Sequence, residues 1–78
     1  MNNSTLPRKR IAIFGSTGSI GTQALDVIDK NKDRFSVEVL TCNGNDTLII
    51  QQALQFRPNI VVVTNDQKYS RVKEALSQ

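Results

Sequence analysis

The sequence predicts an α/β fold: half of a doubly wound, Rossmann-type parallel sheet in the order β-α-β-α-β-α. Three short apolar runs alternate with three segments of helical periodicity within 78 residues. A glycine-rich loop joins the first run to the first helical segment. Strands that alternate with helices form parallel sheets with right-handed crossovers. We therefore expect three parallel strands in the spatial order 3-2-1.

The first predicted strand is Ile11–Phe14, a continuous apolar run of the kind that is buried on both faces of a parallel sheet. The first predicted helix is Ser19–Lys30, and Lys30 suits its carboxyl end because the helix dipole favours cations there. Apolar residues at helical spacing are expected on one buried face: Ile20, Ala24, Val27 and Ile28.

The second predicted strand is Val37–Thr41, and the second helix is Thr47–Phe56, with Asn45 or Asp46 as its N-cap. Pro58 is expected to end that helix and to bias Arg57 toward an extended conformation. The residues predicted on its inner stripe are Ile49, Ala53 and Phe56, with Ile50 and Leu54 beside them.

The third predicted strand is Ile60–Val63, which is β-branched throughout. Asn65 or Asp66 is expected to cap the last helix, Gln67–Leu76. Its inward residues are predicted to be Tyr69, Val72 and Leu76.

The composition argues against several classes of protein. The single Cys42 forms no internal disulfide, and no apolar run approaches the roughly 18 residues of a membrane span. The net charge of +3 is modest, and few aromatic residues accompany the basic ones, which argues against a nucleic-acid surface. We expect a soluble, cytoplasmic protein that binds neither nucleic acid nor membrane.

The loop at residues 15–21, GSTGSIG, carries the predicted chemistry. Gly15 permits a tight turn off the strand, Gly18 permits close approach of a pyrophosphate, and Gly21 lets the helix pack on the strand. The N–H groups of Gly18, Ser19 and Ile20 would face the phosphates, and the hydroxyl groups of Thr17 and Ser19 would add hydrogen bonds. A tight strand–helix turn without a ligand is the alternative.

The turn after the second strand predicts which dinucleotide binds. NAD-preferring sites place a carboxylate there to accept from the ribose 2′-OH. Here the turn is Asn43, Gly44 and Asn45, with no acid before Asp46 and no Arg or Lys. A carboxylate would repel a 2′-phosphate and amides would not, so the sequence favours NADP over NAD. Residues 10–78 are accordingly expected to be the amino-terminal part of an incomplete NADP-binding Rossmann domain, and residues 1–9 a flexible basic lead.

The residues resemble one family closely. The motif GSTGSIG, followed by the polar pair Thr22 and Gln23, Ala24 and the run LDVI, is similar to the start of 1-deoxy-D-xylulose 5-phosphate reductoisomerases. The resemblance extends through the Asn-containing turn to Pro58 and covers only the first portion of the family's length. It implies that Thr17, Gly18, Ser19 and Ile20 hold the NADPH pyrophosphate. It also implies that Asn43, Gly44 and Asn45 meet the adenosine 2′-phosphate, although the lysine that the family commonly carries in this turn is missing.

The resemblance implies an NADPH- and metal-dependent oxidoreductase. The family converts 1-deoxy-D-xylulose 5-phosphate to 2-C-methyl-D-erythritol 4-phosphate in the non-mevalonate isoprenoid pathway. Its sugar phosphate substrate and its Mg or Mn ion would be bound by later segments, so no catalytic residue and no metal ligand is assigned here. The complete enzyme is expected to be a homodimer, and this fragment alone is expected to be inactive.

Two alternatives remain at this point. Tyr69 and Lys73 match the YxxxK pair of short-chain dehydrogenases, whose glycine loops are similar, but Tyr69 occurs too early in the chain and is expected to pack in the core. The other alternative is a non-catalytic, truncated nucleotide-binding module.

Overall fold

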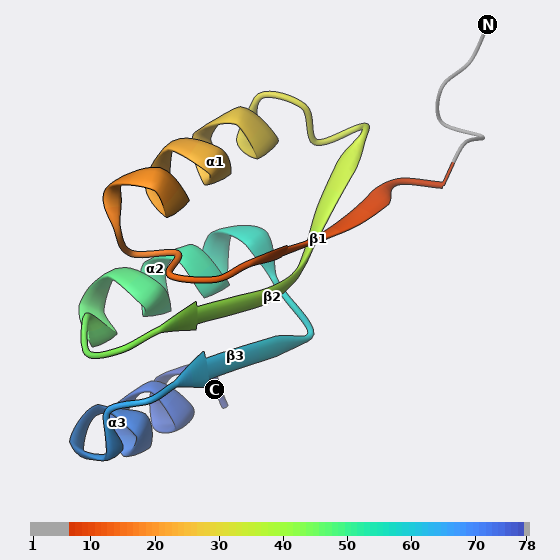
Figure 1. Ribbon diagram of the computed structural model, residues 1–78. Helices are drawn as coiled ribbons and strands as arrows, with labels where there is room; N and C mark the ends of the chain where they lie inside the picture. The colour runs from red at the N-terminus through yellow and green to blue at the C-terminus, as the bar shows by residue number, and fades with distance from the viewer. Residues whose placement is uncertain (1–6, 78) are drawn as a thin grey trace, which may run out of the picture.

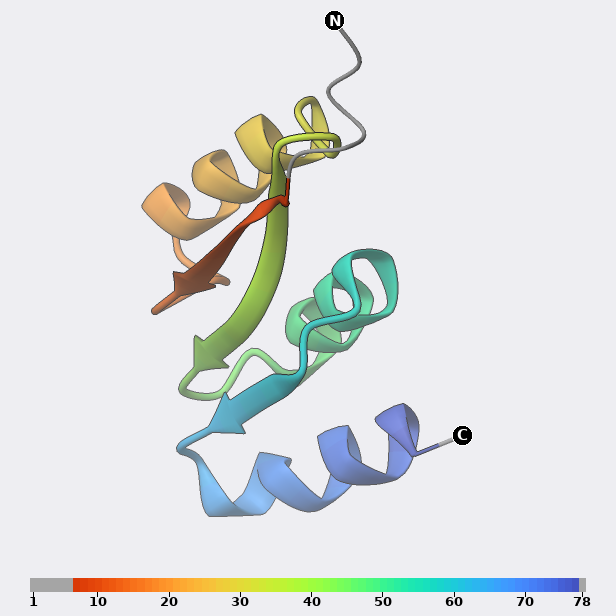
Figure 2. The ribbon, with the colours of Figure 1, turned by 90° about the vertical axis from the view of Figure 1, so that its right-hand side faces the viewer.

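The computed structural model describes residues 7–77 as a three-stranded parallel sheet with three helices (Figure 1). The elements are β1 (Lys9–Ile13), α1 (Ser19–Asp29), β2 (Phe35–Cys42), α2 (Asp46–Phe56), β3 (Ile60–Val63) and α3 (Asp66–Leu76). β2 lies between β1 and β3 and is parallel to both, which confirms the predicted fold class and the order 3-2-1. Figure 2 shows the three arrows running in one direction.

The element bounds follow the sequence closely. β3 is as predicted, and α2 and α3 each begin one residue earlier, behind the N-caps Asn45 and Asn65. β1 begins two residues earlier than predicted, because Lys9 and Arg10 pair with β2, and it ends at Ile13. Phe14, predicted as a buried strand residue, lies outside the strand and is exposed. Residues 1–6 of the expected basic lead lie outside the described residues.

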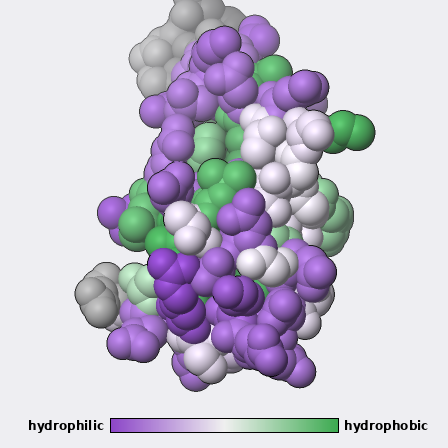
Figure 3. Space-filling model, turned by 90° about the vertical axis from the view of Figure 1, so that its left-hand side faces the viewer, coloured by the Kyte–Doolittle hydropathy of each residue, from purple (hydrophilic) through white to green (hydrophobic). Residues whose placement is uncertain are grey.

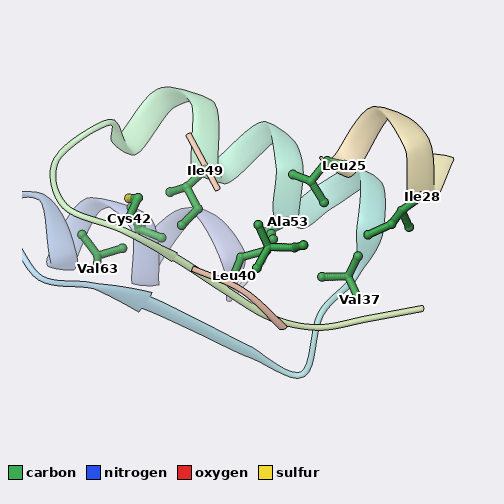
Figure 4. Close-up of a cluster of buried hydrophobic side chains, with 10 residues drawn as sticks. Leu25, Ile28, Val37, Leu40, Cys42, Ile49, Ala53 and Val63 are labelled. Carbon is green, nitrogen blue, oxygen red and sulfur yellow. The ribbon is translucent and has the colours of Figure 1, made fainter. Parts of the chain in front are cut away.

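One hydrophobic core joins the helices to a single face of the sheet. Leu25 and Ile28 of α1 and Ile49 and Ala53 of α2 lie on the same side of Leu40 (Figure 4). Val72 of α3 belongs to the same cluster. Leu40 and Ile49 have no exposed surface, so the contact between β2 and α2 is the centre of the core.

A bulge in β2 explains how Val37 and Leu40, three residues apart, both face this core. The pairing with β1 passes from Val37 directly to Val39, which leaves Glu38 as an extra residue. Asn59 holds Glu38 in place, since its backbone N–H donates to the Glu38 carbonyl and its side chain donates to the Glu38 carboxylate. The bulge changes the face on which the later residues of β2 lie.

The predicted buried face of α1 was wrong in part: Ile28 is buried and Ala24 packs against the core, but Ile20 and Val27 lie on the exposed side. Ile20 is 85% exposed and Val27 is 57% exposed, whereas Gly21, Leu25 and Ile28 are buried. The rotation of α1 is set by Gly21, which touches the backbone of the preceding loop. Once Gly21 faces inward, residues four and seven positions later also do so, and Ile20 is turned outward.

The conformation predicted for Arg57 was also wrong. Arg57 is left-handed, with φ 53° and ψ 53°, rather than extended. In this conformation its N–H donates to the Ala53 carbonyl at 2.8 Å, which satisfies one of the last carbonyl groups of α2. Pro58 still prevents the helix from continuing.

The outer face of the sheet is open among the described residues. Ile60 is 51% exposed and Val62 is 41% exposed, and Ala12 of β1 is exposed as well. On the helical side, Tyr69 is 48% exposed rather than packed in the core as predicted, while Val72 is buried. Leu76 is partly buried.

Candidate functional site

The loop after β1 is bonded to the end of β2. Gly15 has φ +71°, a left-handed conformation that favours glycine. Its N–H donates to the Thr41 hydroxyl at 2.9 Å, and the Ser16 N–H donates to the Thr41 carbonyl at 2.8 Å. The chain therefore leaves the sheet sharply while its backbone groups remain paired.

Gly21 is the position where α1 touches this loop. A Cβ atom there would lie 2.3 Å from the Gly15 carbonyl oxygen and 2.7 Å from the Ser16 Cα. Both distances are far below van der Waals contact, and both involve backbone atoms. Only glycine allows this approach, as the sequence predicted.

Gly18 is the N-cap of α1, and no side chain caps this helix end. The prediction that its N–H is free was wrong, because this group donates to the Gly15 carbonyl at 3.2 Å. Within residues 7–77, the N–H groups of Ser19, Ile20 and Gly21 have no acceptor. These three donors at a positive helix end, with no acidic residue in the first turn, suit an anion.

The side of Gly18 is open to a ligand. A Cβ atom there would meet only the Gly15 carbonyl oxygen, at an ordinary 3.6 Å. Packing within the protein therefore does not require glycine here, whereas close approach of a phosphate group does. Thr17 is partly buried and Ser19 is exposed, and the two residues flank Gly18 in the chain. The residues present fit a bound pyrophosphate.

A buried amide lies against the loop, at a position that no local sequence signal marks as functional. The Gln52 Nε2 donates to the Ser16 carbonyl at 2.8 Å. Gln52 is 6% exposed and Ser16 has no exposed surface. The Gln52 Oε1 and the Ser16 Oγ have no partner among the described residues. The only sequence signal was a polar residue next to Ala53 on the inner stripe of α2.

The second predicted turn lies at the same edge of the sheet and is tied to the turn after β3. The Asn43 carbonyl accepts from the Asn65 N–H at 3.0 Å, and the Asn43 Oδ1 accepts from the Thr64 hydroxyl at 2.9 Å. The Asn45 Oδ1 accepts from the Leu48 N–H and caps α2. Gly44 lies between them, close to Asn65.

Arg71 of α3 brings a positive charge to this second turn. Its Nη1 forms an ion pair with Asp46 and donates to the Thr47 hydroxyl at 3.3 Å. The Arg71 side chain is 57% exposed, and that of Asp46 is only 12% exposed. The sequence showed no cation within the turn, because the one that the fold supplies lies 25 residues further along the chain.

The electrostatics of the turn follow from this ion pair. The Arg71 guanidinium holds the pKa of Asp46 below its usual range, and the positive charge of Lys68 acts in the same direction. Asp46 therefore stays ionised and paired at neutral pH. Cys42, just before the turn, is a buried hydrophobe as predicted, and burial raises the pKa of its thiol.

The predicted site residues lie on two loops at the carboxyl edge of the sheet, where open α/β sheets bind ligands. Figure 3 faces this edge and shows a pale surface, the colour of glycine, serine and threonine, next to a hydrophilic one. In the part of the chain that the structure describes, no three His, Cys, Asp or Glu side chains come together as metal ligands. No helix among residues 7–77 is long and apolar enough to cross a membrane.

Comparison with known proteins identifies one family. Residues 11–78 match the family described as 1-deoxy-D-xylulose 5-phosphate reductoisomerase. The enzyme of that name from Porphyromonas gingivalis is 59% identical over 70 residues, which cover 90% of this chain and 18% of the relative. The chain thus spans about a fifth of the length of the curated relatives that it matches.

Solved structures agree in fold. The reductoisomerase from Zymomonas mobilis, in complex with NADPH, superposes with a TM-score of 0.85 at 34% identity over 90% of this chain and 18% of that chain. A second reductoisomerase structure, in complex with magnesium, gives a TM-score of 0.82 at 24% identity over 91% of this chain and 18% of that chain.

Proposed function

The chain belongs to the 1-deoxy-D-xylulose 5-phosphate reductoisomerase family, and from this we propose that it forms the NADPH-binding part of such an enzyme. One observation carries the proposal: the open side of Gly18 lies beside three unpaired N–H groups at the start of α1. This arrangement accepts a pyrophosphate with the backbone alone. The proposed contacts are the loop residues Gly15, Thr17, Gly18, Ser19, Ile20 and Gly21.

The turn after β2 is proposed to meet the adenosine ribose and its 2′-phosphate through Asn43, Gly44 and Asn45. No carboxylate is free there, because Asp46 is paired with Arg71. Arg71 uses only its Nη1 in that pair and remains more than half exposed. We propose that Arg71, together with Lys68, supplies the positive charge that the family commonly places on a lysine within the turn.

The activity of the whole protein is part of the proposal. NADPH, when bound, supplies a hydride for the conversion of 1-deoxy-D-xylulose 5-phosphate to 2-C-methyl-D-erythritol 4-phosphate in the non-mevalonate isoprenoid pathway. The substrate and a divalent metal, Mg or Mn, are proposed to bind outside residues 7–77, in a homodimeric, cytoplasmic enzyme. Segment 1–78 alone is proposed to be inactive. The family match does not favour the short-chain dehydrogenase or non-catalytic alternatives.

The first prediction tests the adenosine turn. It uses a complete reductoisomerase that contains residues 11–78, termed the complete enzyme; a relative that carries these residues in place of its own serves equally. Asn43→Asp should weaken NADPH binding by at least tenfold and NADH binding much less, because a carboxylate repels the 2′-phosphate. The substitution preserves the acceptor for the Thr64 hydroxyl, so the turn should keep its shape.

The dissociation constants of both cofactors, measured by fluorescence titration, decide this prediction. Gln51→Glu is the matched control, because it adds the same charge at an exposed position of α2 away from the turn. If Asn43→Asp weakens the binding of NADPH and of NADH equally, the turn does not determine the preference between the two cofactors. Failure of the unmodified complete enzyme to bind NADPH would refute the proposed function itself.

The second prediction concerns acid stability. Because the folded-state pKa of Asp46 is lowered, its pair with Arg71 stabilises the fold above the ordinary Asp pKa. That contribution is lost as the pH falls through the folded-state pKa. Asp46→Asn should therefore lower the denaturation midpoint at pH 7. It should also reduce the difference between the midpoint at pH 7 and the midpoint at pH 3. Asp33→Asn, at an exposed position, is the control, and an unchanged pH dependence in Asp46→Asn would contradict the prediction.

A further inference from the structure

We propose that Gln52 is a positioning residue: from the buried side of α2, it holds the phosphate-binding loop in its binding conformation. The inference rests on the proposed function and assigns a role to a residue that touches no ligand. Its basis is the hydrogen bond from the Gln52 Nε2 to the Ser16 carbonyl, 2.8 Å long and buried. The two residues are 36 positions apart, so α2 fixes one peptide group of the loop after β1.

The geometry of the peptide bond gives this contact a consequence for binding. In a trans peptide the C=O and the following N–H point in opposite directions, and the structure contains no cis peptide. Gln52 holds the Ser16 carbonyl toward the protein interior. The N–H of Thr17 therefore points away from the interior, and it has no acceptor within residues 7–77. Gln52 thereby orients a fourth donor, Thr17 N–H, for a pyrophosphate.

Packing alone does not explain an amide at this position. Gln52 lies between Ile49 and Ala53 on the buried side of α2, where an apolar side chain of similar size would fill the same space. The amide leaves its own Oε1 and the Ser16 Oγ without partners among the described residues. Buried, unpaired polar atoms cost stability. The hydrogen bond to the loop is the feature that an apolar residue would not reproduce.

The same helix connects the two halves of the site. α2 begins at the Asn45 cap, which closes the adenosine turn, and about two turns later it carries Gln52, which contacts the glycine loop. A displacement of α2 would therefore disturb both loops together. The pyrophosphate loop and the adenosine turn are held at a fixed separation by one rigid element.

The first variant for the test is Gln52→Met in the complete enzyme, which keeps the side-chain length and removes the donor. We expect the NADPH dissociation constant to rise about fivefold to tenfold, as for the loss of one net hydrogen bond. Adenosine 2′-monophosphate, which has no pyrophosphate, should bind with unchanged affinity. The urea midpoint should change little, because the substitution removes the unpaired Gln52 Oε1 but leaves the Ser16 carbonyl without its donor. Gln51→Met, at the exposed neighbouring position, is the matched control.

The second variant, Gln52→Glu, adds a readout that a purely structural role would not produce. A protonated carboxyl group donates to the Ser16 carbonyl as the amide does, whereas a carboxylate repels it. Burial raises the pKa of a carboxyl group, so the change should fall within an accessible range of pH. NADPH affinity in Gln52→Glu should be near normal at low pH and should fall as the pH rises. Gln51→Glu and the unmodified enzyme should lack this extra dependence.

The outcomes separate the inference from the proposed function. NADPH binding by the unmodified complete enzyme tests the function before any variant is made. Normal NADPH affinity in Gln52→Met, or equal losses for NADPH and adenosine 2′-monophosphate, would overturn the positioning role. If Gln52→Met does not fold, Gln52→Glu decides the question alone, and an affinity without the extra pH dependence would overturn the inference.

Discussion

Replacement of Gly21 by alanine is expected to disrupt the first strand–helix unit and to abolish NADPH binding. The added Cβ would lie 2.3 Å from the Gly15 carbonyl oxygen. No side chain can rotate away to relieve this contact, so α1 has to move off the loop. Overpacking an interior typically costs roughly 1–3 kcal/mol, and we expect about 3 kcal/mol or more here because only backbone shifts relieve the clash.

Two other glycines provide controls for this prediction. Gly44→Ala places a Cβ at an ordinary 3.5 Å from the Asn65 side chain and should change the unfolding free energy by less than about 1 kcal/mol. Gly18→Ala should fold normally but bind NADPH weakly, because its Cβ occupies the open side of the loop. Urea unfolding and NADPH titration of the complete enzyme distinguish the three. A Gly21→Ala variant as stable as Gly44→Ala would contradict the packing described for α1.

The isolated segment, residues 1–78, is expected to self-associate instead of behaving as a monomer. β1 is an edge strand whose outer N–H and C=O groups have no partner in the described part of the chain. The open face of the sheet exposes Ile60 and Val62, and Phe14 beyond β1 is 77% exposed. An exposed strand edge can pair with a strand of another chain, and an exposed apolar patch favours association between chains.

Light scattering across a dilution series measures this association. Val62→Lys places a charge on the open face and should shift the segment toward the monomer without disturbing the core, because Val62 is on the side away from the helices. Ser70→Lys, at an exposed position of α3, is the control for added charge. An unmodified segment that remains monomeric at high concentration would contradict the expected self-association.

Local sequence signals predicted most of the fold. The β-branched run Ile60–Val63 is β3 residue for residue, and Asn45 and Asn65 both cap helices. These features depend on neighbours in the chain, so the sequence displays them directly. The glycine spacing predicted the close contact at Gly21 for the same reason.

The errors and omissions concern contacts between distant segments. Hydrophobic periodicity placed Ile20 inward, but the contact of Gly21 with the loop rotates α1 and exposes Ile20. Arg71 reaches the second turn only because α3 packs beside α2, and Gln52 contacts Ser16 only because α2 lies next to the loop after β1 in the folded chain. No pattern in a single segment predicts such a contact, because the contact depends on how distant segments pack together.

The hydrogen bonds that join the turns after β2 and β3 have a consequence for the thermodynamics of binding. Asn43 is held through both its carbonyl and its side chain, and Asn45 is fixed as a helix cap. Ordering a free residue costs about 1–2 kcal/mol of conformational entropy. Because folding has already ordered this turn, a nucleotide that binds here does not incur that loss again. Association at the adenosine end should therefore be limited by diffusion and charge steering and not by the closing of a loop.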